Sequence, residues 1–312
     1  MGQEFNPDFE TLANRLNKFM PQSDVAPLKI LREGFNSIVF ETAGGQVIKL
    51  FKTDGPTRRW LNETLLVNEI RHKLPALIPE VTMVFDVSFG TMHTAVGYAR
   101  IAGRTLQQDD VATPPDDLLV RDLAGFLVAL HSCQISSPRL AEMLPSHEDW
   151  ESRMEQLRDS ALRPLSMRLE LSDYEALELW WDLFLNDPRA KLVRPVLIHG
   201  DFWHENIMVD GDPLRLNGVL DFKEAHIGDP TQDFATLAHI SPEFAMSVAE
   251  SYIAQGGELD PDWRFRMARF WELREFFGIR YSVEANDQEA LTNSIRKLCD
   301  GPIFNRKTRL DG

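Results

Sequence analysis

Cysteine is scarce in this sequence. The 312 residues include only Cys133 and Cys299, which lie far apart and lack the spacing of metal-binding or disulfide-rich sequences. Cys133 follows an apolar helical run, which favours a buried free thiol. We therefore expect no zinc site, and we expect a reducing compartment, the cytoplasm.

Long apolar runs are missing as well. No segment approaches the roughly 20 apolar residues that a membrane-spanning helix needs. The N-terminus "MGQEFNPDFE" is acidic and has no basic, apolar leader, so we expect no signal peptide. Gly2 does not open a myristoylation motif, because Asn6 stands where serine or threonine is required. We expect no membrane partner.

Positive charge is in deficit. Lys and Arg number 33 against 48 Asp and Glu, which gives a formal net charge of −15 at pH 7. Such a surface repels nucleic acid and suits a cationic ligand, although acidity also simply keeps proteins soluble. The rest of the composition, 43% hydrophobic and 26% charged, is that of a soluble globular protein. We expect a monomer with no nucleic-acid partner.

The hydrophobic pattern changes about a third of the way along the chain. Short β-type runs follow a first helix at 6–19 and surround a second at about 56–74, and helical runs dominate after "RIAGRTL". The later helices are expected at about 116–132, 147–161, 172–185, 230–239, 241–254, 261–281 and 286–299. The sequence thus predicts an α+β fold with a β-rich lobe at 1–98, a hinge at 99–105 and an α-helical lobe at 106–312, with a cleft between the lobes.

Three polar residues in two neighbouring segments occur in an order that indicates a function. "HGDFWHENIMVD" places Asp201 and Asn206 five residues apart between apolar runs, and "GVLDFKEAHIGDP" places Asp221 at the end of a β-type run. Phosphoryl transfer needs a carboxylate that orients and deprotonates the attacking hydroxyl, and oxygen ligands for Mg²⁺. Asp201 fits the base, and Asn206 and Asp221 fit the metal ligands. Single Asp or Asn residues also favour turns, so the order and strand context carry this prediction.

These segments resemble the aminoglycoside phosphotransferase family, whose fold is similar to that of protein kinases. The resemblance covers roughly residues 30–299. "NETLLVNEIRHKLPALIPEV", "DLAGFLVALHS" and "FRMARFWELREFFG" look most similar to aminoglycoside 2''-phosphotransferases. The resemblance implies a bilobal protein-kinase-like fold, with Asp201 as catalytic base beside the substrate hydroxyl and Mg²⁺ at Asn206 and Asp221.

Two residues depart from the family pattern. The subgroup often has histidine at the position of Asn206, but an amide oxygen is the better ligand for a hard cation. Lys223 stands where glycine often follows Asp-Phe, and it places an extra cation beside the metal loop.

The resemblance also implies a lysine–glutamate pair in the first lobe. Lys49 in "GQVIKLFK" has strand context, whereas its rival Lys52 lies at the strand's end. Glu63 is favoured over Glu69, because the apolar residues after it fall at the family's helical spacing. Such a pair would position the lysine on the donor phosphates.

The phosphate-covering loop has little glycine. "REGFNSIVF" contains only Gly34, so no G-x-G-x-x-G motif is present, and we expect contacts from backbone N–H groups and Ser37.

The purine site is expected at the end of the first lobe. The resemblance puts Tyr98 just before a hinge of Ala99, Arg100 and Ile101. A bulky tyrosine there implies a shortened pocket and a preference for GTP over ATP. The alternative is an ordinary strand tyrosine in the core, with ATP accepted.

Acidic and aromatic residues are candidates for binding a cationic sugar. Glu224 matches a substrate-facing position of the related enzymes, and a late helix adds Trp271, Glu272 and Glu275. The aromatic residues of that helix also have the spacing of core positions.

The sequence therefore predicts a Mg²⁺-dependent phosphotransferase that moves the γ-phosphate of GTP or ATP to an aminoglycoside hydroxyl, the 2''-OH. The alternatives are a macrolide kinase or a choline, homoserine or methylthioribose kinase. A pseudokinase-like binding module would lack one of Lys49, Asp201 and Asp221, and none is missing. Asp229, Asp233 and His199 are favoured as scaffolding.

Overall fold

The computed structural model describes residues 7–20, 24–34, 37–54, 58–111, 117–145, 150–191 and 194–305, without the side chains of 53–54 and 58–61. The chain forms two compact units. Unit 1 comprises Met1–Thr105 and Asn206–Glu224, and unit 2 comprises Leu106–Glu205 and Ala225–Gly312. The sequence analysis placed 206–224 in the C-terminal lobe. The structure groups it with the first unit, because its strands pair with β6 (Arg104–Thr105).

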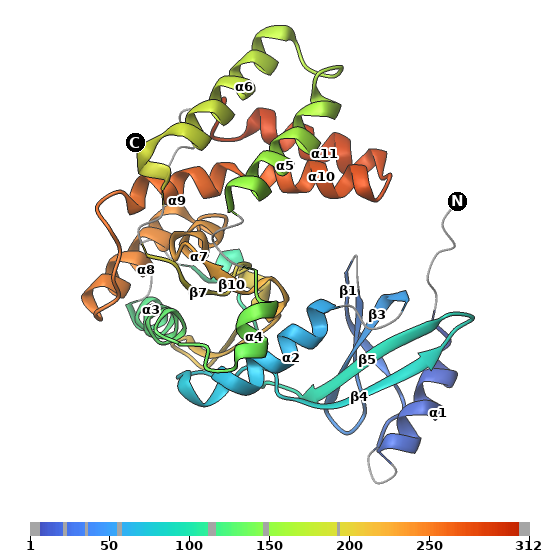
Figure 1. Cartoon of the computed structure of the whole chain (residues 1–312). Coiled ribbons are helices and arrows are strands. Elements are labelled where there is room, and N and C mark those ends of the chain that lie inside the picture. Colours follow the sequence, from blue (N-terminus) through green and yellow to red (C-terminus); the bar gives the residue numbers. More distant parts are fainter. Residues whose placement is uncertain are drawn as a thin grey trace. The chain divides into compact units, whose positions relative to one another are not determined.

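Unit 1 contains a five-stranded antiparallel sheet (Figure 1). The strands run in the order β1-β2-β3-β5-β4, so β3 is the central strand. Their bounds are β1 Lys29–Glu33, β2 Ser37–Glu41, β3 Gln46–Asp54, β4 Val81–Ser88 and β5 Met92–Ala99.

The two faces of this sheet differ in character. One face buries Phe40, Ile48 and Leu50 against Leu12 and Leu16 of α1 (Phe9–Phe19), and it forms the apolar core of the unit. Alternation along each strand turns the intervening residues to the other face. That second face carries the predicted nucleotide-site residues.

Helix α2 (Arg58–Ile70) joins β3 to β4 and continues as a 3-10 turn, Arg71–Lys73. Among the side chains of this helix that the structure describes, those of Leu66, Val67 and Ile70 are buried. The expected start of this helix at Pro56 lies outside the described residues. A small second sheet, β6-β8-β9, places β8 (Ile207–Asp210) beside β9 (Arg215–Val219) as an antiparallel hairpin.

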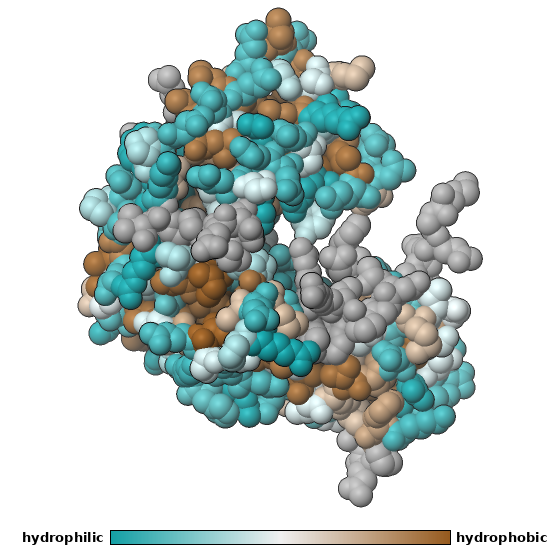
Figure 2. Space-filling view, viewed as in Figure 1, coloured by the Kyte–Doolittle hydropathy of each residue, from teal (hydrophilic) through white to brown (hydrophobic). Residues whose placement is uncertain are grey.

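Unit 2 is mainly helical. Its helices are α3 Asp117–His131, α4 Pro138–Met143, α5 Trp150–Leu165, α6 Leu171–Asn186, α7 Thr231–Leu237, α8 Pro242–Ala254, α9 Trp263–Glu272, α10 Arg274–Glu284 and α11 Gln288–Asp300. A core of large aromatic side chains, among them Trp180, Trp181, Phe184 and Phe276, packs α5 and α6 against α10 and α11. The α5–α6 hairpin, at the top of Figure 2, mixes hydrophobic and hydrophilic surface.

Three details differ from the sequence prediction. The single helix expected over 261–281 is divided at Leu273 into α9 and α10. The backbone of Leu273 itself still has helical dihedral angles (φ −66°, ψ −22°). Helix α4 and the three-residue strand β10 (His226–Gly228), which pairs with β7 (Val196–Ile198), were not expected, because such short segments show no hydrophobic period.

Among the described residues, no helix combines the length and apolarity that crossing a bilayer would take.

Candidate active site

Lys49 lies in a cluster of charged side chains in unit 1. Its Nζ donates a hydrogen bond to Asp221 Oδ1 at 2.8 Å and lies 3.7 Å from Glu63 Oε2. The side chains of Lys49 and Glu63 are only 10% and 15% exposed. The rival Lys52 instead forms an ion pair with Glu33. The structure thus brings together the lysine, the glutamate and the second aspartate that the sequence singled out.

The proton affinities in this cluster reflect its mutual pairing. Burial alone would lower the pKa of Lys49, but Glu63 and Asp221 raise it above its usual value. Burial raises the pKa of Glu63, and Lys49 offsets this only in part. Burial would also raise the pKa of Asp221, but Lys49 and Lys223 together hold it well below its usual range. Lys49 is therefore protonated and Asp221 ionised at neutral pH.

The two predicted metal ligands lie at the same end of the β8–β9 hairpin. Asn206 directly precedes β8, and Asp221 follows β9, and the Leu220 N–H donates to the Asn206 carbonyl at 2.8 Å. Asp221 has a left-handed backbone (φ 65°), and Glu63 Oε1 accepts the Phe222 N–H at 3.1 Å, which fixes the turn. Among the described residues, no cluster of three His, Cys, Asp or Glu side chains forms a metal cage. An amide and a carboxylate oxygen fit Mg²⁺, which is usually held by one or two protein groups plus phosphates and water.

Lys223 lies against the same aspartate. Its Nζ is 3.0 Å from Asp221 Oδ2, and its side chain is 34% exposed. The lysine belongs to a short 3-10 turn, Phe222–Glu224, that also carries the predicted substrate residue Glu224. Both oxygens of the Asp221 carboxylate are thus paired with ammonium groups.

Ser37 and Tyr98 share a sheet face with Lys49. Lys49 lies opposite Val39 of β2, Ser37 lies two residues before Val39, and Tyr98 lies opposite Val47 of β3. Burial raises the pKa of Tyr98 to about 12, and Lys49, Glu63 and Asp221 are close enough to influence it. Tyr98 therefore does not belong to the apolar core on the opposite face.

The structure describes the expected hinge in full but the predicted phosphate loop only in part. The Arg100 N–H donates to the Gly45 carbonyl at 3.3 Å, and its side chain pairs with Glu41. The Arg100 amide is therefore engaged within the protein rather than open to a purine. Ala99 ends β5 and Ile101 is buried. Residues 35–36, in the predicted phosphate loop, lie outside the described residues.

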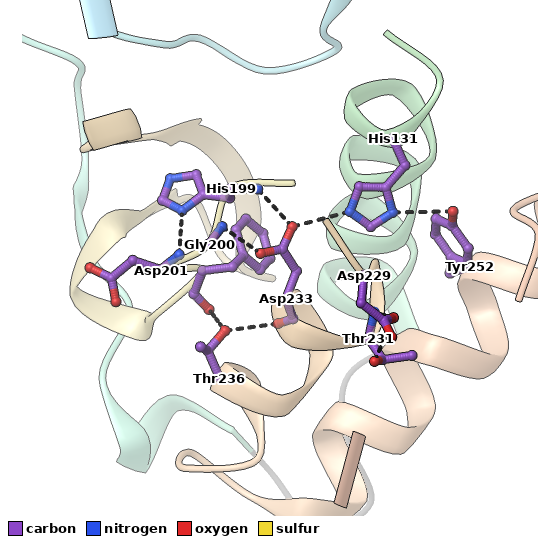
Figure 3. A network of polar contacts seen from close by, with 10 residues as sticks. His131, His199, Gly200, Asp201, Asp229, Thr231, Asp233, Thr236 and Tyr252 are labelled. Carbon is purple, nitrogen blue, oxygen red and sulfur yellow. Dashed lines mark hydrogen bonds and ion pairs between the residues drawn. The ribbon is translucent and has the colours of Figure 1, made fainter. Parts of the chain in front are cut away.

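Asp201 stands on a loop of unit 2 that is fixed through its backbone. Asp233 on α7 accepts the N–H groups of His199 and Gly200, each at 2.9 Å (Figure 3). The Asp201 N–H donates to His199 Nδ1 at 3.2 Å. In Figure 3 the Asp201 carboxylate points away from this network. The loop is thus braced through its backbone, and the Asp201 carboxylate is not one of the bracing groups.

A buried histidine extends this brace. His131 on α3 places Nε2 3.1 Å from Asp233 Oδ2 and Nδ1 3.1 Å from the Tyr252 hydroxyl. Thr236 donates to the Phe202 carbonyl at 2.9 Å. Burial would raise the pKa of Asp233, but the hydrogen bond from His131 lowers it below its usual value. Sequence reasoning missed His131, Thr236 and Tyr252. The only sequence signal for this brace was the position of His131 on an apolar helix face.

Asp229 makes the scaffolding contacts that the sequence favoured for it. Its carboxylate accepts the Thr231 N–H at 2.9 Å, at the start of α7. Arg266 Nε donates to its other oxygen at 2.5 Å, and both side chains are almost fully buried. Arg266 also pairs with Asp260.

The candidate substrate residues of unit 2 line one cavity but make different contacts. Glu272 is buried, with one oxygen accepting Trp180 Nε1 at 2.7 Å and the other pairing with Arg269 at 2.9 Å. Both of its oxygens are thus engaged within the protein. Trp271 Nε1 donates a hydrogen bond to His239 Nδ1 at 3.1 Å. Glu275 is partly buried, which raises the pKa of its carboxyl group.

Trp271, Glu272 and Glu275 line a cavity of about 110 Å³, which Arg274 and Lys297 also line. Burial lowers the pKa of His239, in the same wall, to about 3, so its ring is neutral at physiological pH. The cavity lining is therefore of mixed charge rather than acidic throughout, and its volume suits one group of a ligand rather than a whole drug-sized molecule.

Comparison with known proteins identifies a family. Residues 59–268 match the model of the phosphotransferase enzyme family, APH. The viomycin phosphotransferase of Streptomyces vinaceus is 28% identical over 207 residues, 63% of this chain and 67% of that protein. The aminoglycoside 3'-phosphotransferase of Escherichia coli is 29% identical over 153 residues, 47% of this chain and 52% of that protein.

A solved structure shows the fold. The GDP and kanamycin complex of APH(2")-IIia superimposes with a TM-score of 0.80 at 21% identity, over 92% of this chain and 96% of that one. This confirms the α+β, protein-kinase-like fold predicted from the sequence. The chain spans between 52% and 67% of the length of three curated relatives that it matches. The chain belongs to the phosphotransferase enzyme family.

Proposed function

We propose that this protein transfers the γ-phosphoryl group of a nucleoside triphosphate to a hydroxyl of an aminoglycoside. The observation that carries the proposal is the paired Lys49–Glu63–Asp221 cluster at the end of the hairpin that bears Asn206. A buried, protonated lysine beside oxygen ligands is what the donor phosphates require. Structural packing alone does not call for a buried ionic cluster, because ion pairs cost desolvation energy that apolar side chains avoid.

Each residue has a role in this reaction. Lys49, held by Glu63, would bind the donor phosphates, with Ser37 on the same sheet face. Mg²⁺ held by Asn206 and Asp221 would neutralise charge on those phosphates. Asp201, whose carboxylate projects from a braced loop, would orient the substrate hydroxyl and accept its proton.

The substrate class rests on charge and on the relatives. The net charge of −15 favours a polycationic ligand. Glu224 and Glu275 are the carboxylates proposed to meet its ammonium groups, with Trp271 beside a sugar ring. One relative is named an aminoglycoside 3'-phosphotransferase, and the superimposed structure holds kanamycin. We propose a 4,6-disubstituted aminoglycoside such as kanamycin, gentamicin or tobramycin, modified at the 2''-OH.

A substrate panel tests this proposal. The purified protein is incubated with GTP or ATP and Mg²⁺ together with aminoglycosides, viomycin, a macrolide, choline or homoserine. Mass spectrometry should show a single added phosphate on an aminoglycoside, and fragmentation should place it on the 2''-oxygen. Reaction with a macrolide alone would establish the alternative function. A reaction unaffected by EDTA would contradict the Mg²⁺ requirement.

Tyr98 is proposed to favour GTP over ATP. Its ring occupies the Lys49 face at the end of β5, where bulk shortens the purine pocket. Tyr98→Ala should raise kcat/KM for ATP relative to GTP, whereas Tyr98→Phe, which keeps the ring, should preserve the wild-type ratio. Equal use of both nucleotides by the wild type would contradict the proposal.

A further inference from the structure

Asp221 has two lysines on one carboxylate. Lys49 Nζ lies 2.8 Å from Oδ1, and Lys223 Nζ lies 3.0 Å from Oδ2. The same carboxylate is proposed above to bind Mg²⁺. A dication that approaches this carboxylate meets an ammonium group on each of its oxygens, so at least one of them must yield.

The two lysines differ in how firmly they are held. Lys49 is on a central strand, is 10% exposed, and also lies near Glu63. Lys223 is 34% exposed, and it forms its ion pair with Asp221, while Glu63 is near enough to feel its charge. Its long side chain can swing into water at little cost. Lys223 is therefore the group that yields.

The charges of the cluster balance as they stand. The two ammonium groups of Lys49 and Lys223 face the two carboxylates of Glu63 and Asp221. If the Lys223 ammonium moves away from Asp221, the remaining cluster of side chains carries an excess negative charge. This excess favours the binding of another cation. Lys223 thus occupies the position at which a positive charge is needed.

We propose that Lys223 is an internal counter-cation that neutralises Asp221 before the metal arrives and competes with Mg²⁺ for this carboxylate. The inference rests on the proposed function, because it assumes that Asp221 is a metal ligand. The metal cannot bind to those molecules in which Lys223 occupies the Asp221 carboxylate. The apparent metal affinity is therefore scaled down to the fraction of molecules in which the carboxylate is open. The strength of the competition is limited to that of a partly exposed ion pair.

Metal binding to the nucleotide-free protein tests the competition without reference to turnover. Free Mn²⁺, a paramagnetic substitute for Mg²⁺, is titrated by electron paramagnetic resonance at low ionic strength. Lys223→Ala should bind Mn²⁺ about three- to tenfold more tightly than the wild type. Lys223→Arg keeps the charge and should bind within about twofold of the wild type. Raising the salt concentration should shrink the difference.

Two further variants separate the possible failures. Lys52→Ala removes one surface charge from the same unit, away from Asp221, and should leave the affinity within about twofold of the wild type. Asp221→Asn should abolish tight binding. If Mn²⁺ binding survives in Asp221→Asn, the metal binds elsewhere and the proposed function loses its metal site. If Asp221→Asn abolishes binding but Lys223→Ala leaves it unchanged or weaker, the role of Lys223 alone is overturned.

Discussion

The loops that carry Asp221 and Asp201 are held in different ways. In unit 1, the Asp221 carboxylate itself is bound by Lys49 and Lys223. In unit 2, Asp233 binds the backbone of the loop, while the carboxylate of Asp201 points away from that network (Figure 3). One loop is held through the carboxylate that we propose to bind the metal, and the other is held by Asp233 rather than by the carboxylate that we propose as the base.

This difference has energetic consequences. A carboxylate that pairs with buried cations cannot be neutralised without leaving those cations uncompensated, so stability and function change together. Neutralising a carboxylate that takes no part in the bracing contacts leaves those contacts in place. The comparison therefore predicts which substitutions will separate the two properties.

The largest expected loss of stability follows removal of the brace. Asp233→Ala leaves the His199 and Gly200 amides without their acceptor and the His131 Nε2 atom without its partner. We expect the free energy of unfolding to fall by about 3–5 kcal/mol in urea titrations. Asp159→Ala, at a 70% exposed aspartate of the same unit, should change it by less than about 0.5 kcal/mol. Similar values for the two variants would show that the brace is not structural.

A smaller loss is expected at the lysine of unit 1. Lys49→Met keeps the apolar stem but leaves Glu63 without a counter-ion, while Asp221 retains Lys223. Unfolding should become easier by about 1–3 kcal/mol, and nucleotide binding should be lost. Lys52→Met is the matched control and should cost less than about 0.5 kcal/mol. Unchanged nucleotide binding in Lys49→Met would break the assignment.

The smallest effect concerns acid pH. Burial would raise the pKa of Asp221, but the two lysines hold it below the usual value of 3.8, so the folded state favours the ionised form. Its contribution to stability is present above pH 3.8 and is lost as the pH falls through the lowered pKa. Asp221→Asn should cost about 1–2 kcal/mol at pH 7, and its difference from the wild type should shrink below pH 3.8. A constant difference across this range would contradict the pairing.

Local patterns were enough to predict much of unit 1. The β-type run "GQVIKLFK" placed Lys49 on a strand, and the strand register in the structure brings Ser37 and Tyr98 to its face. The order of Asp201, Asn206 and Asp221 singled out two turns that the structure places in different units. Spacing alone could not indicate that division, which depends on β8 pairing with β6.

Long-range contacts were beyond the sequence patterns. His131 and Asp233 are 102 residues apart, and no local period relates them. Glu272 illustrates a different limit, because it was a candidate as an acidic residue on the same expected late helix as Trp271 and Glu275. Its burial depends on Trp180 and Arg269, which pair with its two oxygens. Which face of α9 is covered is decided by packing and not by the helix's own sequence.

The catalytic assignment of Asp201 is the central claim, and one measurement tests it most directly. The kcat of Asp201→Asn is determined with GTP, Mg²⁺ and the aminoglycoside that the panel identifies, on protein whose urea unfolding is recorded in parallel. We predict that kcat falls by about 10²–10⁴-fold while the free energy of unfolding changes by less than about 0.5 kcal/mol. Near wild-type turnover by Asp201→Asn would contradict the account.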